Sequence, residues 1–103
     1  MCSPKGYLWY IYGVEFEYDP EKSQTNQGKH GVDFEKAKEL WKGSYVEFAA
    51  RQEYENRFAI MGPIKGKLYT CIYTLRGDRV RIISCRRSQE KEVALYEQTI
   101  KGA

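Results

Sequence analysis

Five arginines gather in the segment RGDRVRIISCRR, which spans residues 76–87. A guanidinium group keeps its positive charge at any physiological pH and can bind phosphate oxygens through two parallel hydrogen bonds. A cluster of arginines is therefore typical of surfaces that bind RNA, where it can also stabilise the negative charge that grows on a phosphate under attack. The alternative is a solvated strand surface on which arginines pair with glutamates of neighbouring strands.

The positive charge of the chain is concentrated in the same region. The formal net charge is +3 over 103 residues. Residues 76–91 contain six basic and two acidic side chains, which gives this segment a charge of +4 and leaves −1 for the rest of the chain. A basic patch on a nearly neutral body favours an anionic partner, although a patch of this size is also compatible with no ligand at all.

Arginine alone cannot complete the cleavage of RNA, because its pKa lies above about 12 and it is a poor proton donor. Cleavage without a metal, in which the ribose 2′-hydroxyl attacks the adjacent phosphate, also needs a proton acceptor and a donor for the leaving 5′-oxygen. His30 is the only histidine and titrates in a suitable range. Its position in KHG also suits the end of a helix, and we favour that capping role. Glu55 is the other candidate, either as the base or as the ion-pair partner of Arg57.

The basic and aromatic residues divide by the role that we assign to them. Arg57 and Arg81 would contact the scissile phosphate, and Arg86 would help them or orient the site. Residues expected to hold flanking phosphates, or in the case of the tyrosine to stack on a base, are Lys29, Arg51, Tyr73, Arg76 and Arg79. The sequence has neither a hydrolase triad nor a magnesium or zinc ligand pattern, so we expect no metal and no other cofactor.

The first half of the chain predicts a strand and two helices that would position these side chains. VEFEYD, residues 14–19, alternates apolar and acidic residues as a strand does. Asp19 and Pro20 suit the N-cap and the first position of a helix that ends near Gly31. Asp33 is the expected N-cap of a second helix.

After Gly43 the sequence alternates, which predicts four strands joined as an antiparallel meander. Their expected ranges are 44–51, 56–62, 67–75 and 79–87, and Ser88 would cap a final helix. Side chains of equal parity share one face of a strand, so the even-numbered positions would form the core. The odd-numbered positions would form a surface that includes Arg57, Arg79, Arg81, Arg87, Tyr69 and Tyr73. Arg86 has the opposite parity, so we expect it at an edge, near a helix end or a carboxylate.

Several segments of the sequence resemble those of the BrnT ribonuclease toxins. FEYDPEKSQTNQGKHGVDFEKA is similar to that family's opening, which typically reads Phe-Glu-Trp-Asp-Pro, then Asn, then Lys-His-Gly-Val, then Phe-Glu-x-Ala. ENRFAIMG and YTLRGDRVRIISCRRSQEKEVALY resemble its central arginine strand and its ending, with Glu92 and Tyr96 in the last helix. The resemblance covers residues 14–100, with Tyr18 in place of the common tryptophan. Residues 1–13 have no counterpart, so we expect an N-terminal extension followed by a single domain over residues 14–103.

The resemblance implies an α+β, RelE-like fold: two N-terminal helices, a twisted antiparallel sheet of about four strands plus an N-terminal strand, and a C-terminal helix. It implies the toxin of a type II toxin–antitoxin pair, an endoribonuclease that cleaves RNA and inhibits translation. It also implies a BrnA-like antitoxin with a ribbon-helix-helix part. Operator DNA would then be bound only through the antitoxin, and a homodimer or a heterotetramer could form.

Two other functions stay open on the residues alone. The same basic face could belong to a non-catalytic nucleic-acid-binding module, or to a degenerate toxin that serves as a co-repressor subunit. The apolar run YLWYIYGV is too short to span a bilayer and lacks a cleavage site after it, so we expect no membrane partner. Cys71 and Cys85 fall in apolar strands and should be buried and reduced, which favours a cytoplasmic protein.

Overall fold

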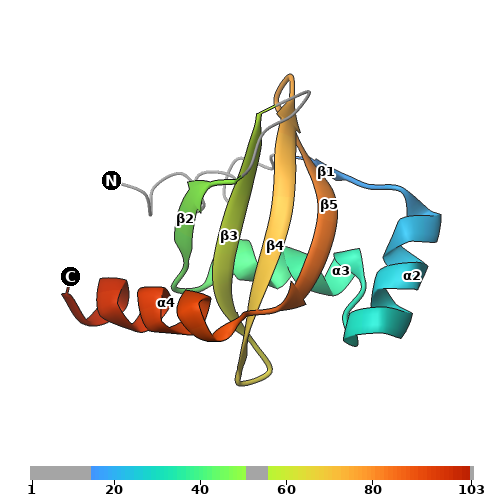
Figure 1. The fold of residues 1–103 in the computed structure, drawn as a ribbon. Coiled ribbons are helices and arrows are strands. Elements are labelled where there is room, and N and C mark those ends of the chain that lie inside the picture. Colours follow the sequence, from blue (N-terminus) through green and yellow to red (C-terminus); the bar gives the residue numbers. More distant parts are fainter. Residues whose placement is uncertain (1–14, 51–55, 103) are drawn as a thin grey trace.

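The computed structural model describes residues 15–50 and 56–102, and the expected extension over residues 1–13 lies outside them. The described residues form an α+β fold, as expected, with one sheet and helices on both of its faces (Figure 1). The strands are β1 (Phe16–Glu17), β2 (Val46–Ala49), β3 (Arg57–Ile64), β4 (Lys67–Arg76) and β5 (Arg79–Arg87). The helices are α2 (Pro20–His30), α3 (Phe34–Ala37), the 3₁₀-helix η1 (Lys38–Lys42) and α4 (Glu90–Gly102). In the described part of the chain, no helix is both long and apolar enough to cross a membrane.

The sheet has the strand order β1-β5-β4-β3-β2 and is mixed rather than wholly antiparallel. The strands from β2 to β5 form the expected antiparallel meander. β1 lies at the far edge and pairs in parallel with β5, through Phe16 opposite Val80 and Glu17 opposite Arg81. The sequence predicted the four antiparallel strands and an additional N-terminal strand, but it did not predict the direction of that strand. β1 reaches its partner through a long connection, so no hairpin fixes its direction.

The two N-terminal helices begin where the capping residues place them. The side chain of Asp19 accepts a hydrogen bond from the Glu21 amide at 2.9 Å, and Pro20 is the first residue of α2. Gly31 ends this helix in the left-handed conformation, with φ 79°, which glycine adopts without steric cost. Asp33 caps α3 by accepting from the Lys36 amide at 2.8 Å. The second helix is a single α-helical turn that continues as η1, rather than one continuous α-helix.

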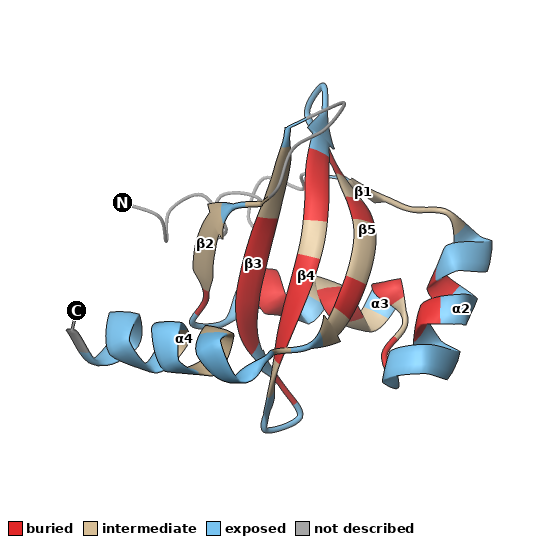
Figure 2. Cartoon of the chain, viewed as in Figure 1, coloured by how far each residue is buried: buried red, intermediate tan, exposed pale blue. Residues whose placement is uncertain are grey.

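The face of the sheet that packs against α3 and η1, which we call the helix face, contains the main core. Buried residues lie along the central strands β3 and β4 and in α3 (Figure 2). β3 contributes Ile60 to this face, and β5 contributes Val80 and Ile82, as their parity predicts. β4 does the opposite, because Tyr69 and Tyr73 are 9% and 1% exposed within this core.

The prediction that Tyr69 and Tyr73 lie beside the arginines was therefore wrong. β4 is a central strand with apolar residues at both parities, so alternation could not decide which face points to the core. The hydroxyl of Tyr73 can be buried because it donates to the carboxylate of Glu47. Burial, and then this hydrogen bond, raise the pKa of the phenol.

A β-bulge in β5 reverses the parity of its last residues. Ile72 of β4 lies opposite Ser84, but Tyr73 lies opposite Ile82, so Ile83 has no opposite residue. As a result Arg86 moves to the face that carries Arg57 and Arg81, which we call the arginine face. Arg87 moves to the helix face, with its guanidinium carbon 6.0 Å from the centre of the Tyr69 ring. The predicted place of Arg87 beside the other arginines was wrong for this reason.

Beyond the end of β1, no strand among the described residues neighbours the edge of β5, and the side chain of Asn26 of α2 hydrogen-bonds to the β5 backbone there. Its side-chain nitrogen donates to the carbonyl oxygens of Cys85 at 2.7 Å and Val32 at 2.8 Å. Its side-chain oxygen accepts from the Cys85 amide at 3.1 Å. Asn26 is only 6% exposed, so these three bonds satisfy polar groups that water does not reach. This one side chain joins α2, the loop after it and the sheet.

Cys71 and Cys85 lie opposite each other on β4 and β5. Both are buried free thiols, as their apolar sequence context indicated. Burial raises the pKa of the Cys71 thiol well above its ordinary value, so this sulfur is held in the unreactive protonated form.

Candidate active site

One row of side chains crosses the arginine face from β3 to β1. Arg57 of β3 lies opposite Thr74 of β4, and Thr74 lies opposite Arg81 of β5. On the other side of Arg81, β1 contributes Glu17. Opposite residues in a sheet point to the same face, so Arg57 and Arg81 flank Thr74 on one surface, with backbones about 10 Å apart. The prediction that these two arginines share a surface is confirmed.

Two more arginines continue this surface at the end of the sheet. Arg76 and Arg79 lie opposite each other on either side of the turn that joins β4 to β5, and their parity places them on the face of Arg81. Arg79 is 55% exposed and Arg81 is 31% exposed at the side chain, so both can reach a ligand in solution. Four residues of the arginine face form one continuous basic patch, which we call the arginine surface: Arg57, Arg76, Arg79 and Arg81.

Two glutamates at the edge strand face the arginine surface. The Nη1 atom of Arg81 donates to Oε2 of Glu17 at 3.0 Å, and Nη1 of Arg79 lies 3.4 Å from Oε1 of the same carboxylate. Nε of Arg79 also pairs with Glu15 at 3.2 Å. The hydrogen bond from Arg81, together with Arg79, holds the pKa of Glu17 below its usual range.

Sequence reasoning did not predict that Glu15 and Glu17 pair with arginines of this surface. Their alternation with apolar residues was visible and correctly indicated a strand. Which strand that segment would join was not visible, because β1 and β5 are separated by most of the chain and pair through only two residues. The sequence did not predict that this segment pairs in parallel with β5, the strand that carries Arg79 and Arg81.

Arg86 is held by a carboxylate of the last helix. Its two terminal nitrogens donate to the two oxygens of Glu92 at 2.8 and 2.9 Å. Glu92 also accepts from the Gln89 amide at 2.7 Å, as the third residue of a capping box does, and from the Thr70 hydroxyl. The expected position of Arg86 near a carboxylate and a helix end is confirmed. Ser88 does not cap α4 as expected, because its hydroxyl bonds to Thr70 instead.

The contact with Arg86 lowers the pKa of Glu92 to about 2 from its ordinary value of 4.5. The ion pair therefore stabilises the fold fully above about pH 4.5, and this contribution is lost as the pH falls towards 2. We expect Glu92→Gln to lower the free energy of unfolding by about 1–3 kcal/mol at pH 7. The difference in stability between the two proteins should shrink progressively below about pH 4.5 and be smallest near pH 2 in urea unfolding. Glu90→Gln, at an exposed position of the same turn, is the control; a Glu92→Gln deficit that does not change with pH would contradict this role of the ion pair.

The structure also places three other predicted residues. Lys29 and His30 are exposed in the last turn of α2, beside a hollow of 230 Å³ that also touches Ile83 and Ser84 of β5. The described hydrogen bond of Arg81 goes to Glu17 and not to His30. Tyr73 is buried on the helix face, so its proposed stacking on a base is corrected. The two predicted residues Arg51 and Glu55 lie outside the described part of the chain.

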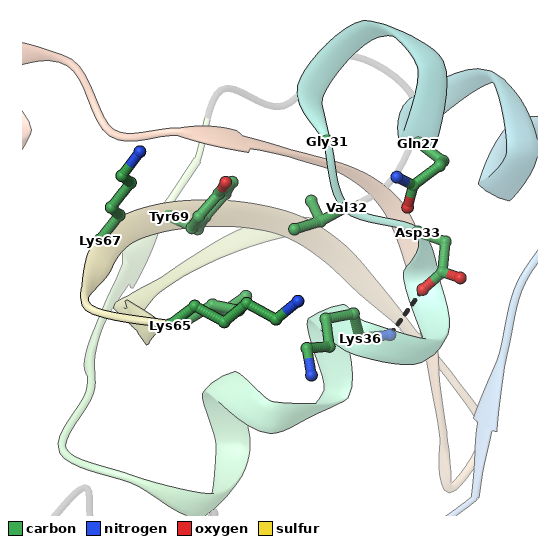
Figure 3. A pocket seen from close by; sticks show the side chains of 9 residues that line it. Gln27, Gly31, Val32, Asp33, Lys36, Lys65, Lys67 and Tyr69 are labelled. Atoms are coloured by element: carbon green, nitrogen blue, oxygen red, sulfur yellow. Dashed lines mark hydrogen bonds between the residues drawn. The ribbon is translucent and has the colours of Figure 1, made fainter.

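A second hollow lies at the opposite end of the sheet, under the turn that joins β3 to β4 (Figure 3). It measures 410 Å³, and its lining includes Lys36, Lys65, Lys67, Asp33 and Tyr69. The ammonium group of Lys36 pairs with Glu39 at 2.9 Å. This hollow is positively charged, but it lies on the other face of the sheet from Arg81 and does not belong to the arginine surface.

In residues 15–50 and 56–102, no group of three His, Cys, Asp or Glu side chains could hold a metal ion.

A family model described as the ribonuclease toxin BrnT of type II toxin–antitoxin systems matches residues 18–92, well over half of the chain. The matched segment includes Arg57, Arg81 and Glu92 and begins one residue after Glu17. Comparison with curated proteins finds no match.

Proposed function

The chain belongs to the BrnT family of ribonuclease toxins of type II toxin–antitoxin systems, and from this premise we propose that it is a metal-independent endoribonuclease that cuts RNA on its arginine surface. The observation that carries the proposal is the row in which Arg57 and Arg81 flank Thr74 on one face. The order of its elements, two helices, a sheet and a C-terminal helix, is what we would expect of a RelE-like toxin.

In the proposed reaction the ribose 2′-hydroxyl attacks the adjacent phosphate, and the bond to the 5′-oxygen breaks. Arg57 and Arg81 contact the non-bridging oxygens, whose negative charge grows as the phosphorane forms. Arginine suits this task because its fork of donors matches two phosphate oxygens at once. Arg76 and Arg79 hold the neighbouring phosphates. Arg86 acts indirectly, because its donors hold Glu92 and thereby fix α4 against the sheet.

A type II system pairs its toxin with a protein antitoxin. We propose that this partner is BrnA-like, with a ribbon-helix-helix part that carries the operator DNA contacts of the complex. It would cover the arginine surface with acidic groups, as Glu15 and Glu17 already do at one edge. A heterotetramer is the assembly that the family analogy favours. Free toxin would cleave cytoplasmic RNA and arrest translation.

One observation favours a second candidate function. Arg79 and Arg81 both pair with glutamates of β1, and such cross-strand pairs are what a solvated, non-catalytic surface would have. A nucleic-acid-binding or co-repressor subunit would use the same face without cutting. It would bind RNA with an affinity that falls steeply as salt rises, and the RNA would stay intact.

The two functions separate when purified protein is incubated with labelled RNA in EDTA, with and without added ribosomes. We expect shortened RNA in at least one arm, with 2′,3′-cyclic phosphate and 5′-hydroxyl ends. Those ends identify attack by the 2′-hydroxyl. Binding with intact RNA in both arms would leave the second candidate as the function.

We expect His30→Ala to change the rate of this cleavage by less than about threefold. Gly31 ends the helix, and an exposed histidine in its last turn is placed to interact with the helix dipole. The variant should melt at a slightly lower temperature, because the interaction of this side chain with the end of the helix is lost. Single-turnover cleavage and a melting curve test both points, and a hundredfold slower reaction would instead make His30 a proton-transfer group.

A further inference from the structure

We propose that Glu17 is the general base of the reaction and takes the proton of the ribose 2′-hydroxyl beside the phosphate held by Arg81. This inference rests on the proposed function and deepens it. It assigns the proton acceptor, which arginine cannot be, to a residue on the edge strand β1.

The position of Glu17 carries the inference. Its Oε2 atom lies 3.0 Å from Nη1 of Arg81, and its side chain is 24% exposed on the arginine face. In RNA the 2′-oxygen lies next to the phosphate that it attacks. A phosphate bound to the remaining donors of Arg81 would therefore bring the 2′-hydroxyl within hydrogen-bond reach of the adjacent carboxylate, which is the first requirement for a base.

The charges around Glu17 suit the same role. Arg81 and Arg79 keep its pKa below the usual range, so the carboxylate is ionised and can accept a proton at neutral pH. When a phosphate takes over part of the guanidinium donors, the carboxylate loses hydrogen bonds that had stabilised its charge. Its proton affinity then rises at the moment when the substrate is in place.

The other described glutamates near the sheet are less suited to act as the base. Glu92 has its oxygens occupied by Arg86, Gln89 and Thr70, and Glu47 accepts from Tyr73, a residue of the helix face. Glu15 touches Arg79 rather than Arg81 and is 69% exposed. It is the matched control for Glu17, because it is a carboxylate on the same segment and paired with the same surface.

The step balances as a proton transfer coupled to transesterification. The 2′-hydroxyl proton moves to a carboxylate oxygen of Glu17 while the 2′-oxygen forms a bond to phosphorus. The bond from phosphorus to the 5′-oxygen breaks, and the leaving 5′-oxygen takes a proton from solvent water. The products are a 2′,3′-cyclic phosphate and a 5′-hydroxyl. Glu17 later returns its proton to water.

The test compares Glu17→Gln, Glu17→Asp and Glu15→Gln with the unaltered protein. Single-turnover cleavage of a mixed-sequence, labelled single-stranded RNA is measured in EDTA from pH 5 to pH 9, with ribosomes if the unaltered protein needs them. We expect Glu17→Gln to slow cleavage by about 10²–10⁴-fold. Its rate should rise about tenfold per pH unit, because hydroxide then replaces the base, while the unaltered protein shows little dependence. Glu17→Asp should keep the flat profile at a reduced rate, and Glu15→Gln should be nearly unchanged.

Binding of an RNA with 2′-O-methyl groups, which cannot be cut, provides the second readout. Removal of a negative charge should leave this binding equal or tighter in Glu17→Gln, so a slower reaction cannot be due to lost affinity. Cleavage by Glu17→Gln that is as fast as or faster than normal would show that Glu17 only shields the arginines, and would overturn the inference while leaving the nuclease intact. If the unaltered protein cuts no RNA, the proposed function and the inference both fail.

Discussion

Replacement of Arg81 by alanine is expected to slow RNA cleavage by about 10²–10³-fold while the protein stays folded. Arg81 stands at the centre of the row, between Thr74 and Glu17, and its guanidinium is the one best placed to hold the phosphate beside a carboxylate. Its loss from a partly exposed position removes one ion pair at the edge of the sheet, which costs little stability. Single-turnover cleavage and growth of cells that express the variant measure the effect.

Arg87→Ala is the control for this experiment. Arg87 lies on the same strand and has the same side chain, but the bulge at Ile83 places it over Tyr69 on the helix face. Its replacement should change the cleavage rate by less than about threefold, since it cannot contact the same phosphate. Growth arrest by normally expressed Arg81→Ala would remove Arg81 from the site. If Arg81→Ala and Arg87→Ala slow cleavage equally, the rate depends on the total positive charge and not on the face of the sheet on which an arginine lies.

Asn26→Asp is expected to lower the free energy of unfolding by about 2–5 kcal/mol at pH 7. The side-chain nitrogen of Asn26 donates to two carbonyl oxygens, and a carboxylate in its place would lose both bonds and face both oxygens with a negative charge. The edge of β5 beyond β1 would then have unpaired polar groups in a buried place. Urea unfolding followed by fluorescence or circular dichroism measures the loss.

The same substitution makes a prediction about pH. A buried carboxylate without a partner cation has a raised pKa, so the penalty should shrink as the pH falls and the group takes up a proton. Gln27→Glu adds the same charge at an exposed neighbouring position and should stay within about 0.5 kcal/mol of the unaltered protein. If Asn26→Asp unfolds at the same urea concentration as the unaltered protein, Asn26 does not complete the sheet edge.

Local signals in the sequence were sufficient for much of the fold. Asp19 and Gly31 bound α2 because a capping side chain and a left-handed glycine act within a few residues of where they stand. β5 spans Arg79–Arg87, as alternation and the flanking turn predicted. Arg81 was placed for a similarly local reason, since β5 alternates basic and apolar residues from Arg79 to Ile82. β3 has buried apolar residues at both parities after Arg57, so the shared face of Arg57 and Arg81 also depends on how the strands pair.

The errors have equally definite causes. β4 has apolar residues on both sides, so periodicity could not orient Tyr73, and the partner that satisfies its hydroxyl is on another strand. The bulge at Ile83 depends on how β4 and β5 fit together, and it changed the faces of Arg86 and Arg87. Glu17 was missed because its role depends on a parallel pairing between distant segments. Each of these features depends on contacts between segments that are distant in the sequence, so no short stretch of sequence predicts it.

The central claim is that Arg57 and Arg81 act on one phosphate from the same face of the sheet, and a double-mutant cycle tests it most directly. Single-turnover cleavage is measured for Arg57→Ala, Arg81→Ala and the protein with both changes, with folding checked by circular dichroism. Residues that stabilise the same transition state act as a unit, so the double variant should be little slower than the slower single variant. Losses that simply multiply, or single variants that cleave at the normal rate, would contradict the claim.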